Sequence, residues 1–283
     1  MRRRAAAERR PRATNTVVGG PAPEDAPLRV FALRRPKPPG YRLVNVTSTS
    51  SSAVWRQLSP MLLGPVALAT PRGIVRAHSV ENAWQYSKVY PVGPLGQPFV
   101  DAAGEPNDAY YSWARAGWES PVAVRFPMGR GARPLYSVGQ WASAEPAAGA
   151  AVTGAADADA EAGADAGADA GADADAAQLA GAGAAQAAGA CAAAAGADHL
   201  GYLEARRRVY APAYAAAAEA SVAYAALVDL YRSGVPIGLV DFDGWDHVGQ
   251  GYSLAAALAE PRVKFGHAFV LAGMLTGERV WEE

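Results

Sequence analysis

Residues 79–90 read Ser-Val-Glu-Asn-Ala-Trp-Gln-Tyr-Ser-Lys-Val-Tyr, and they are the most informative stretch of this 283-residue chain. Ser79 is a typical helix N-cap, and Glu81 in the first turn complements the helix dipole. A helix over 79–90 aligns four side chains at i, i+3, i+4 and i+7 along one face: Glu81, Trp84, Gln85 and Lys88. A solvent-facing stripe rarely holds Trp, and a core stripe rarely holds Glu and Lys. The stripe therefore predicts either the wall of a ligand pocket or an amphipathic helix whose charged groups are merely solvated.

The segments around this helix predict the fold class. Apolar runs typical of strands cover residues 41–47, 62–69, 73–77 and 236–240. Helical periodicity covers residues 79–90, 108–117, 200–232, 253–260 and 263–276. In the long helix over 200–232, Pro212 marks either a kink or a new start. The order of strands, helices, a strand and more helices predicts a single α+β domain, mostly helical around a small sheet.

The charge of the chain is divided among segments. The whole chain has a net charge of -1, with 51% hydrophobic and 19% charged residues, which excludes a fibrous protein. Residues 1–40 carry ten bases and three acids without a sustained apolar period, so we expect a disordered basic arm. Residues 146–198 carry eight acids and no bases and consist almost wholly of Ala, Gly and Asp. Because they offer no side chains for a core, we expect a flexible insertion within the domain formed by residues 41–283.

The expected compartment follows from cysteine usage and the lack of targeting segments. Cys191 is the single cysteine, which excludes a disulfide framework within the chain and fits a reducing environment. No run approaches the roughly 20 apolar residues of a membrane span. The basic start over residues 1–10 lacks a following apolar run; it suits a disordered tail, and also a transit peptide or a nuclear address. We expect an intracellular, cytoplasmic protein that is not secreted, makes no membrane contact, and binds nucleic acid at most non-specifically through residues 1–40.

A second cluster of polar residues follows an apolar strand. Residues 237–246 read Ile-Gly-Leu-Val-Asp-Phe-Asp-Gly-Trp-Asp. Alternation along a strand places Asp241 and Asp243 on the same side if the strand continues. Two neighbouring carboxylates suit general acid/base chemistry or a divalent metal, because each shifts the pKa of the other. Carboxylates that cap a turn and the next helix are the structural alternative.

Two further groups are basic. Residues 125–134 read Arg-Phe-Pro-Met-Gly-Arg-Gly-Ala-Arg-Pro, a loop suited either to phosphate contacts or to plain surface charge. Lys264 and His267 lie three residues apart on the last helix, although a lone His in an apolar run is typical of a core histidine. No His/Cys cluster has zinc spacing, so we expect neither a metal nor a cofactor.

Together these segments resemble the NADAR family, also called YbiA-like, over about residues 73–275. Residues 79–88 resemble the family's Ser-x-Glu-x-x-Phe-Gln-x-x-Lys helix, with Trp84 in the aromatic position. The family's Asp-x-x-Trp-Gly segment is matched loosely after the strand, so either Asp241 or Asp243 is the equivalent carboxylate. A family tryptophan ahead of the middle helix is matched by Trp141, with Trp118 as the alternative. The departures are those of a distant branch.

The resemblance implies an N-glycosidase or hydrolase that acts on ADP-ribose or a related small-molecule nucleotide. It makes Glu81 the catalytic carboxylate and Asp243 or Asp241 a second acid/base. It also implies ligand-binding side chains that stack on a base, orient the ligand or meet phosphate: Trp84, Gln85, Lys88, Arg130, Arg133 and Trp141. The alternative is a non-catalytic nucleotide-binding or interaction module.

Overall fold

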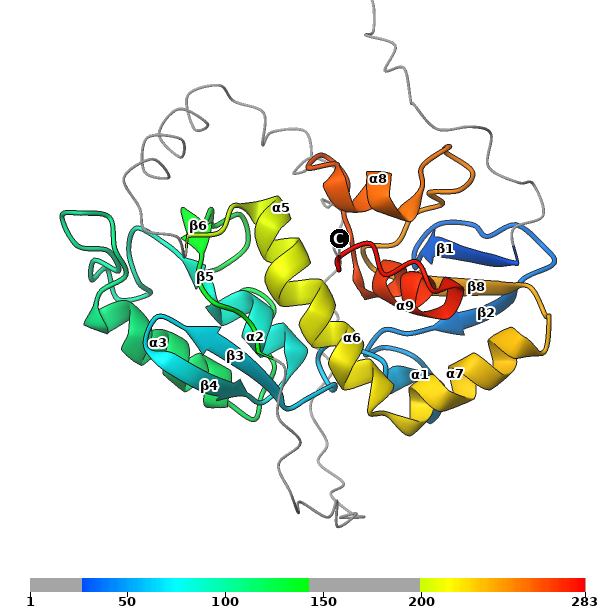
Figure 1. The fold of residues 1–283 in the computed structure, drawn as a ribbon, viewed down its shortest axis with the longest axis horizontal. Helices are drawn as coiled ribbons and strands as arrows, with labels where there is room; N and C mark the ends of the chain where they lie inside the picture. The colour runs from blue at the N-terminus through cyan, green and yellow to red at the C-terminus, as the bar shows by residue number, and fades with distance from the viewer. Residues whose placement is uncertain (1–26, 143–198, 283) are drawn as a thin grey trace, which may run out of the picture.

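A computed structural model describes residues 27–142 and 199–282, and this part of the chain has the predicted α+β fold. Figure 1 shows a sheet with α2 and α3 on one side of the molecule and a second sheet with α9 on the other. The helical run from α5 to α6 passes between the two. Residues 1–26 of the expected arm and the expected insertion over 146–198 lie outside the described residues.

The first sheet is parallel, and its central strand is β8. Strand β8 (Ile237–Asp241) lies between β1 (Leu28–Ala32) and β2 (Arg42–Asn45). All five residues of β8 are buried, which explains the apolar run over residues 237–240 that precedes Asp241. The register pairs Ile237 with both Leu28 and Arg42.

Strand β1 corrects one prediction, because it lies inside the segment expected to be a disordered arm up to residue 40. Its Leu-Arg-Val-Phe-Ala sequence buries Leu28, Val30 and Phe31 against the core. The average composition of residues 1–40 is dominated by Arg and Pro, and it obscured a five-residue apolar run. Residues 28–32 therefore do not belong to the expected disordered arm.

The other strands form two small antiparallel sheets in the described part of the chain. In the larger, β3 (Val66–Thr70) lies between β4 (Gly73–Ala77) and β7 (Gln140–Trp141). In the smaller, β5 (Lys88–Val89) pairs with β6 (Tyr136–Ser137). The strand expected over 73–77 is confirmed, and the strand expected over 62–69 begins only at Val66. The single small sheet expected from the sequence is thus three separate sheets.

The described helices are short, and their bounds are as follows: α1 Ala53–Arg56, α2 Val80–Tyr86, α3 Asp108–Glu119, α5 Tyr202–Ala205, the π-helix η2 Arg206–Tyr210, α6 Ala211–Glu219, α7 Val222–Arg232, α8 Leu254–Ala259 and α9 His267–Thr276. The predicted cap is confirmed, since the Ser79 Oγ accepts from the Asn82 N–H at 3.2 Å. Gly277 ends α9 in the left-handed conformation, as expected.

Two predicted helices differ from the structure. The helix over 79–90 ends at Tyr86, because Val89 leaves to pair with Tyr136 in the small sheet. The single helix over 200–232 is interrupted by η2 and then bends by 85° between α6 and α7. Pro212 lies at the start of α6, where a missing N–H is tolerated.

The elements share one hydrophobic core, with α6 packed against α2, β3 and α9. In residues 27–142 and 199–282 no single helix combines the length and apolarity of a membrane span; only the bent pair α5–α6 with α7 reaches both.

Candidate functional site

The N-terminus of α2 is fixed from the preceding loop and buries Glu81. The backbone N–H of Glu81 donates to the Pro60 carbonyl at 2.9 Å, and that of Val80 donates to the Leu63 carbonyl at 2.8 Å. The Glu81 residue is 7% exposed. A buried carboxyl group needs polar partners, because desolvation otherwise disfavours its charged form.

Glu81, Gln85 and Lys88 form one hydrogen-bonded chain. The Gln85 Nε2 donates to the Glu81 Oε1 at 2.9 Å, and the Lys88 Nζ donates to the Gln85 Oε1 at 2.8 Å. Lys88 lies beyond the end of α2, yet its side chain returns to the helix face. The predicted polar stripe is therefore a connected structure, although only part of it is helical.

Trp84 lies beside this chain with protein groups around its indole. The Lys88 Nζ lies 4.6 Å from the Trp84 ring centroid, in a cation–π contact. The rings of Tyr202 and Tyr210 lie 6.2 and 5.3 Å away. Any base that stacks on the face of Trp84 covered by Lys88 has to displace that side chain.

The burial of this chain shifts two pKa values in opposite directions. Burial raises the pKa of the Glu81 carboxyl, while the Gln85 hydrogen bond and the charges of Lys88, Arg125 and His267 oppose the rise. Burial lowers the pKa of the half-buried Lys88 to about 8, against the charges of Glu81 and Asp243. The site therefore holds a carboxyl group that keeps its proton more readily than usual beside an amine that loses it more readily.

Asp243 follows β8 and lies between two cations. The Arg125 Nη2 lies 3.3 Å from one Asp243 oxygen, and the Lys264 Nζ lies 3.2 Å from the other. The Asp243 side chain is 33% exposed. This carboxylate is thus reachable from solvent and is neutralised by side chains from two different loops.

Asn82 holds the loop that carries Arg125. The Asn82 Nδ2 donates to the carbonyls of Ser120 and Val122 at 2.9 and 3.1 Å, and its Oδ1 accepts from the Val124 N–H at 3.1 Å. Asn82 is fully buried, so these three bonds satisfy its amide. Sequence reasoning missed this residue, although it lies next to Glu81.

Asp241 is enclosed, unlike Asp243. Its Oδ2 lies 3.1 Å from the His267 Nδ1, and the His267 Nε2 lies 2.9 Å from the Val46 carbonyl oxygen. Burial raises the pKa of Asp241 and the charge of His267 opposes the rise. The two aspartates that the sequence left as alternatives therefore differ in access: Asp243 faces solvent and Asp241 faces the interior.

Three predicted ligand-binding residues lie in other surroundings. Arg130 and Arg133 are exposed, and the Arg130 guanidinium lies 5.6 Å from the Phe126 ring centroid. Trp141 in β7 pairs with Leu68 in β3, and its partly buried side chain packs against the core. The basic residue of this segment that reaches the site is Arg125.

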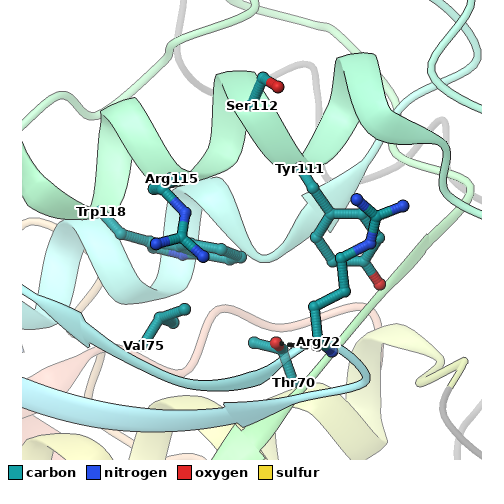
Figure 2. A pocket seen from close by; sticks show the side chains of 7 residues that line it. All are labelled: Thr70, Arg72, Val75, Tyr111, Ser112, Arg115 and Trp118. Carbon is teal, nitrogen blue, oxygen red and sulfur yellow. Dashed lines mark hydrogen bonds between the residues drawn. The ribbon is translucent and has the colours of Figure 1, made fainter.

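A separate hollow lies between α3 and the β3–β4 hairpin (Figure 2). It has a volume of about 150 Å³, and it is lined by Thr70, Arg72, Val75, Tyr111, Ser112, Arg115 and Trp118. Figure 2 shows the Arg72 side chain lying against Tyr111, with 4.0 Å from guanidinium to ring centroid. A neighbouring hollow of about 290 Å³ shares Arg72 and Tyr111 and includes Glu105 and His199. Trp118, the alternative to Trp141, lines the first hollow and is 1% exposed.

Within residues 27–142 and 199–282, no group of three His, Cys, Asp or Glu side chains is arranged to hold a metal ion. Comparison of the chain with protein-family models, with curated proteins and with solved structures finds no match.

Proposed function

We propose that the protein is an N-glycosyl hydrolase acting on ADP-ribose or a related nucleotide-ribosyl compound, as the resemblance of residues 79–88 to the NADAR helix implies. The observation that carries the proposal is the state of Glu81. Its carboxyl group is buried and accepts a hydrogen bond from Gln85. Burial raises the pKa of this carboxyl group, and the charges of Lys88 and Arg125 oppose the rise. Buried carboxyl groups whose pKa is shifted by desolvation and by specific charge partners are typical of acid/base sites.

The chemistry requires one proton and one water molecule. Cleavage of a ribosyl C–N bond leaves positive charge on the ribose and negative charge on the departing nitrogen. Glu81 in its protonated form donates its proton to that nitrogen, and the resulting carboxylate stabilises the ribosyl cation. Water then adds its hydroxyl to the ribosyl carbon, and its remaining proton restores Glu81 or passes to a second carboxylate.

We assign the role of that second carboxylate to Asp243, because Asp241 is enclosed by His267 and the start of α9. Arg125 and Lys264 flank Asp243 and are suited to contact a phosphate group. In the proposal they replace Arg130 and Arg133, for which the resemblance implied phosphate contacts. The lone cysteine of the chain supports an intracellular setting for this activity.

The test is turnover of defined substrates by the purified full chain. ADP-ribose and ADP-ribosylated substrates are incubated with the wild type, with Glu81→Gln and with Glu119→Gln, and products are separated by chromatography and identified by mass. Glu119 is exposed on α3 and serves as the matched control. We expect turnover by wild type and control, and a loss of about 100-fold or more in Glu81→Gln. Equal turnover by all three proteins would remove Glu81 from the mechanism.

A non-catalytic module, in which Trp84 and the nearby cations hold a nucleotide, is the second candidate. The ring is already in contact with Lys88, Tyr202 and Tyr210, so a bound base has to rearrange the site. Calorimetry separates the two functions: tight binding of ADP-ribose without any product indicates a module, and the absence of binding rejects both.

A further inference from the structure

Arg206 has a buried guanidinium group that is bonded to neutral acceptors. It belongs to the π-helix η2 and is 1% exposed. Within residues 27–142 and 199–282 its five acceptors are the Tyr202 hydroxyl at 2.9 Å and the carbonyls of Ala257, Leu258, Glu260 and Val263 at 3.4, 3.1, 3.4 and 3.0 Å. The Glu260 carboxylate is bonded instead to Arg262, at 2.8 Å. The positive charge of Arg206 is therefore buried without a carboxylate bonded to it in the described part of the chain.

Two local rules are broken at this residue. A buried charge without a bonded partner of opposite charge is costly, because water no longer solvates it. The backbone departs from the α-helix as well, since the Ala211 N–H donates to the Arg206 carbonyl five residues back instead of four. Single turns of π-helix inside α-helices are frequent at functional sites. Departures of this kind are expected where a side chain serves the site rather than the fold alone.

The contacts of Arg206 fix the connection between α8 and α9. Ala257 and Leu258 belong to the last turn of α8, where carbonyls have no partner within the helix, and the Arg206 Nη1 donates to both of them. The Arg206 Nη2 donates to the Val263 carbonyl, beyond the end of that helix. The planar fork of a guanidinium meets both groups at once, which a single ammonium cannot do. One side chain therefore sets the distance between the end of α8 and Val263.

The residue that follows this connection is Lys264, which reaches the Asp243 carboxylate. Its Nζ lies 3.2 Å from an Asp243 oxygen, and its side chain is 52% exposed, so packing alone constrains it little. The Lys264 carbonyl accepts from the Trp245 Nε1 at 2.8 Å. The Lys264 backbone is thus held by Arg206 through Val263 and by Trp245 directly. The place of this backbone determines where the ammonium lies relative to Asp243.

Arg206 also contacts the aromatic side chains beside Trp84. Its guanidinium lies 4.5 Å from the Tyr202 ring centroid, and the Tyr202 ring lies 6.2 Å from the Trp84 ring. Tyr210, the last residue of η2, brings a second ring to 5.3 Å from Trp84. The π-helix that carries Arg206 therefore meets the site at Trp84, while its guanidinium holds the segment that carries Lys264.

We propose that Arg206 is a positioning residue for this site: it holds the connection between α8 and α9 so that Lys264 lies beside Asp243, where the ammonium receives a phosphate of the ligand. The phosphate contact rests on the proposed function, whereas the hold on Lys264 does not. The inference gives the ligand a direction, with its base toward Trp84 and its phosphates toward Lys264.

The experiment compares Arg206→Lys with Arg208→Lys in the full chain. Arg206→Lys keeps a positive charge but replaces the fork by a single ammonium, which cannot bond both the end of α8 and Val263. Arg208 lies in the same π-helix and is exposed, so Arg208→Lys is the matched control. Wild-type protein labelled with ¹⁵N arginine gives a readout that needs no variant, because a guanidinium held by five hydrogen bonds gives separate NMR signals for its two Nη groups. A single averaged Nη signal for Arg206 would overturn the inference whether or not the variants fold.

The hold on Lys264 is measured without any ligand through the Trp245 indole N–H, which donates to the Lys264 carbonyl. In protein labelled with ¹⁵N tryptophan and assigned with Trp245→Phe, exchange of this hydrogen with deuterium should become about 10-fold faster in Arg206→Lys, because the bond opens more often, and stay unchanged in Arg208→Lys. The indole N–H of Trp118, which is 1% exposed on α3, reports general loosening in the same spectrum. An unchanged Trp245 rate, or equal acceleration at Trp118, would overturn the inference.

Kinetics test the part that depends on the proposed function. If the wild type turns over ADP-ribose, Arg206→Lys and Lys264→Ala should each raise KM about 10-fold with little change in kcat, through loss of one charged hydrogen bond. The double variant should show no further rise, because both changes remove the same contact. Effects that multiply in the double variant would reject the role of Arg206 in positioning Lys264. If the wild type shows no turnover, the proposed function fails, while the Trp245 exchange still decides the hold on Lys264.

Discussion

Arg125 and Asp243 form an ion pair, with 3.3 Å between the Arg125 Nη2 and an Asp243 oxygen, although 118 positions separate them in the chain. Arg125 follows α3 and Asp243 follows β8, so the pair joins the two sides of the molecule seen in Figure 1. Both side chains are about a third exposed. Ion pairs of this kind contribute about 0–1 kcal/mol, so changes here should affect chemistry more than stability.

Asp243→Asn tests that separation directly. We expect the free energy of unfolding in urea to change by less than about 1 kcal/mol, while turnover of an ADP-ribosyl substrate falls about 100-fold through loss of an acid/base group. Asp229→Asn on the exposed face of α7 is the matched control. Full turnover by Asp243→Asn would leave Asp243 without a part in the reaction.

Asn82→Ala should weaken the fold and displace Arg125 together. The substitution leaves the Val124 N–H and two carbonyls without their partner, which we expect to cost about 2 kcal/mol in the free energy of unfolding. Urea unfolding measures this loss, and Ser120→Ala, which keeps the Ser120 carbonyl, is the comparison. A loss no larger than that of Ser120→Ala would show that the three hydrogen bonds of the Asn82 side chain contribute little to stability.

The contrast between Asn82 and Glu81 shows how far the sequence determines this site. The polar stripe was predictable, because helical spacing brings Glu81 and Gln85 together wherever the helix lies. The Ser79 cap and the strand over 73–77 were predictable for the same local reason. The contacts of Asn82 reach 38–42 positions along the chain, and no local pattern contains that information.

The same limit explains the basic residues. No local sequence pattern distinguishes Arg125 from Arg130 and Arg133. Only the path of the loop after α3 brings Arg125 to Asp243. His267 was given the interpretation of a core histidine, which its burial supports, but its pairing with Asp241 depends on how α9 meets the end of β8. Strand β1 was missed because the Arg- and Pro-rich composition around it obscured its short apolar run.

Gly117→Ala should destabilise the contact between α2 and α3. An added Cβ would lie 2.0 Å from the Tyr86 ring. That ring has little room to shift, because the Trp113 ring lies against it with 4.8 Å between the two centroids. Overpacking of this kind costs about 1–3 kcal/mol, and we expect the upper end of that range by thermal or urea unfolding. Ala116→Ser, exposed on the same helix, should be nearly neutral. Equal stability of the two variants would contradict the close packing.

Lys88 should react with small acylating reagents in a narrow pH range. Its pKa is lowered to about 8, so half of its amines are neutral near that pH. We expect the rate of acetylation at Lys88, followed by peptide mass spectrometry, to reach half its maximum near pH 8. Lys264 in the same digest controls for reagent quality. A Lys88 rate that continues to climb steadily through pH 10 would contradict the burial of this amine.

Glu81→Gln should make the protein more stable at neutral pH while it removes activity. The folded-state pKa of Glu81 is raised above its ordinary value of 4.5, so the folded protein binds more protons than the unfolded chain between those two pKa values. Stability therefore falls as pH rises through that range, and the cost persists at pH 7. Glutamine has no such cost, and its carbonyl still accepts from Gln85. Urea unfolding at pH 4 and pH 7 should show a gap between variant and wild type that opens in favour of the variant at the higher pH. A gap that stays constant, or closes, would mean that Glu81 is ionised in the folded protein at no cost, and the proton that the proposed mechanism takes from it would then have to come from elsewhere.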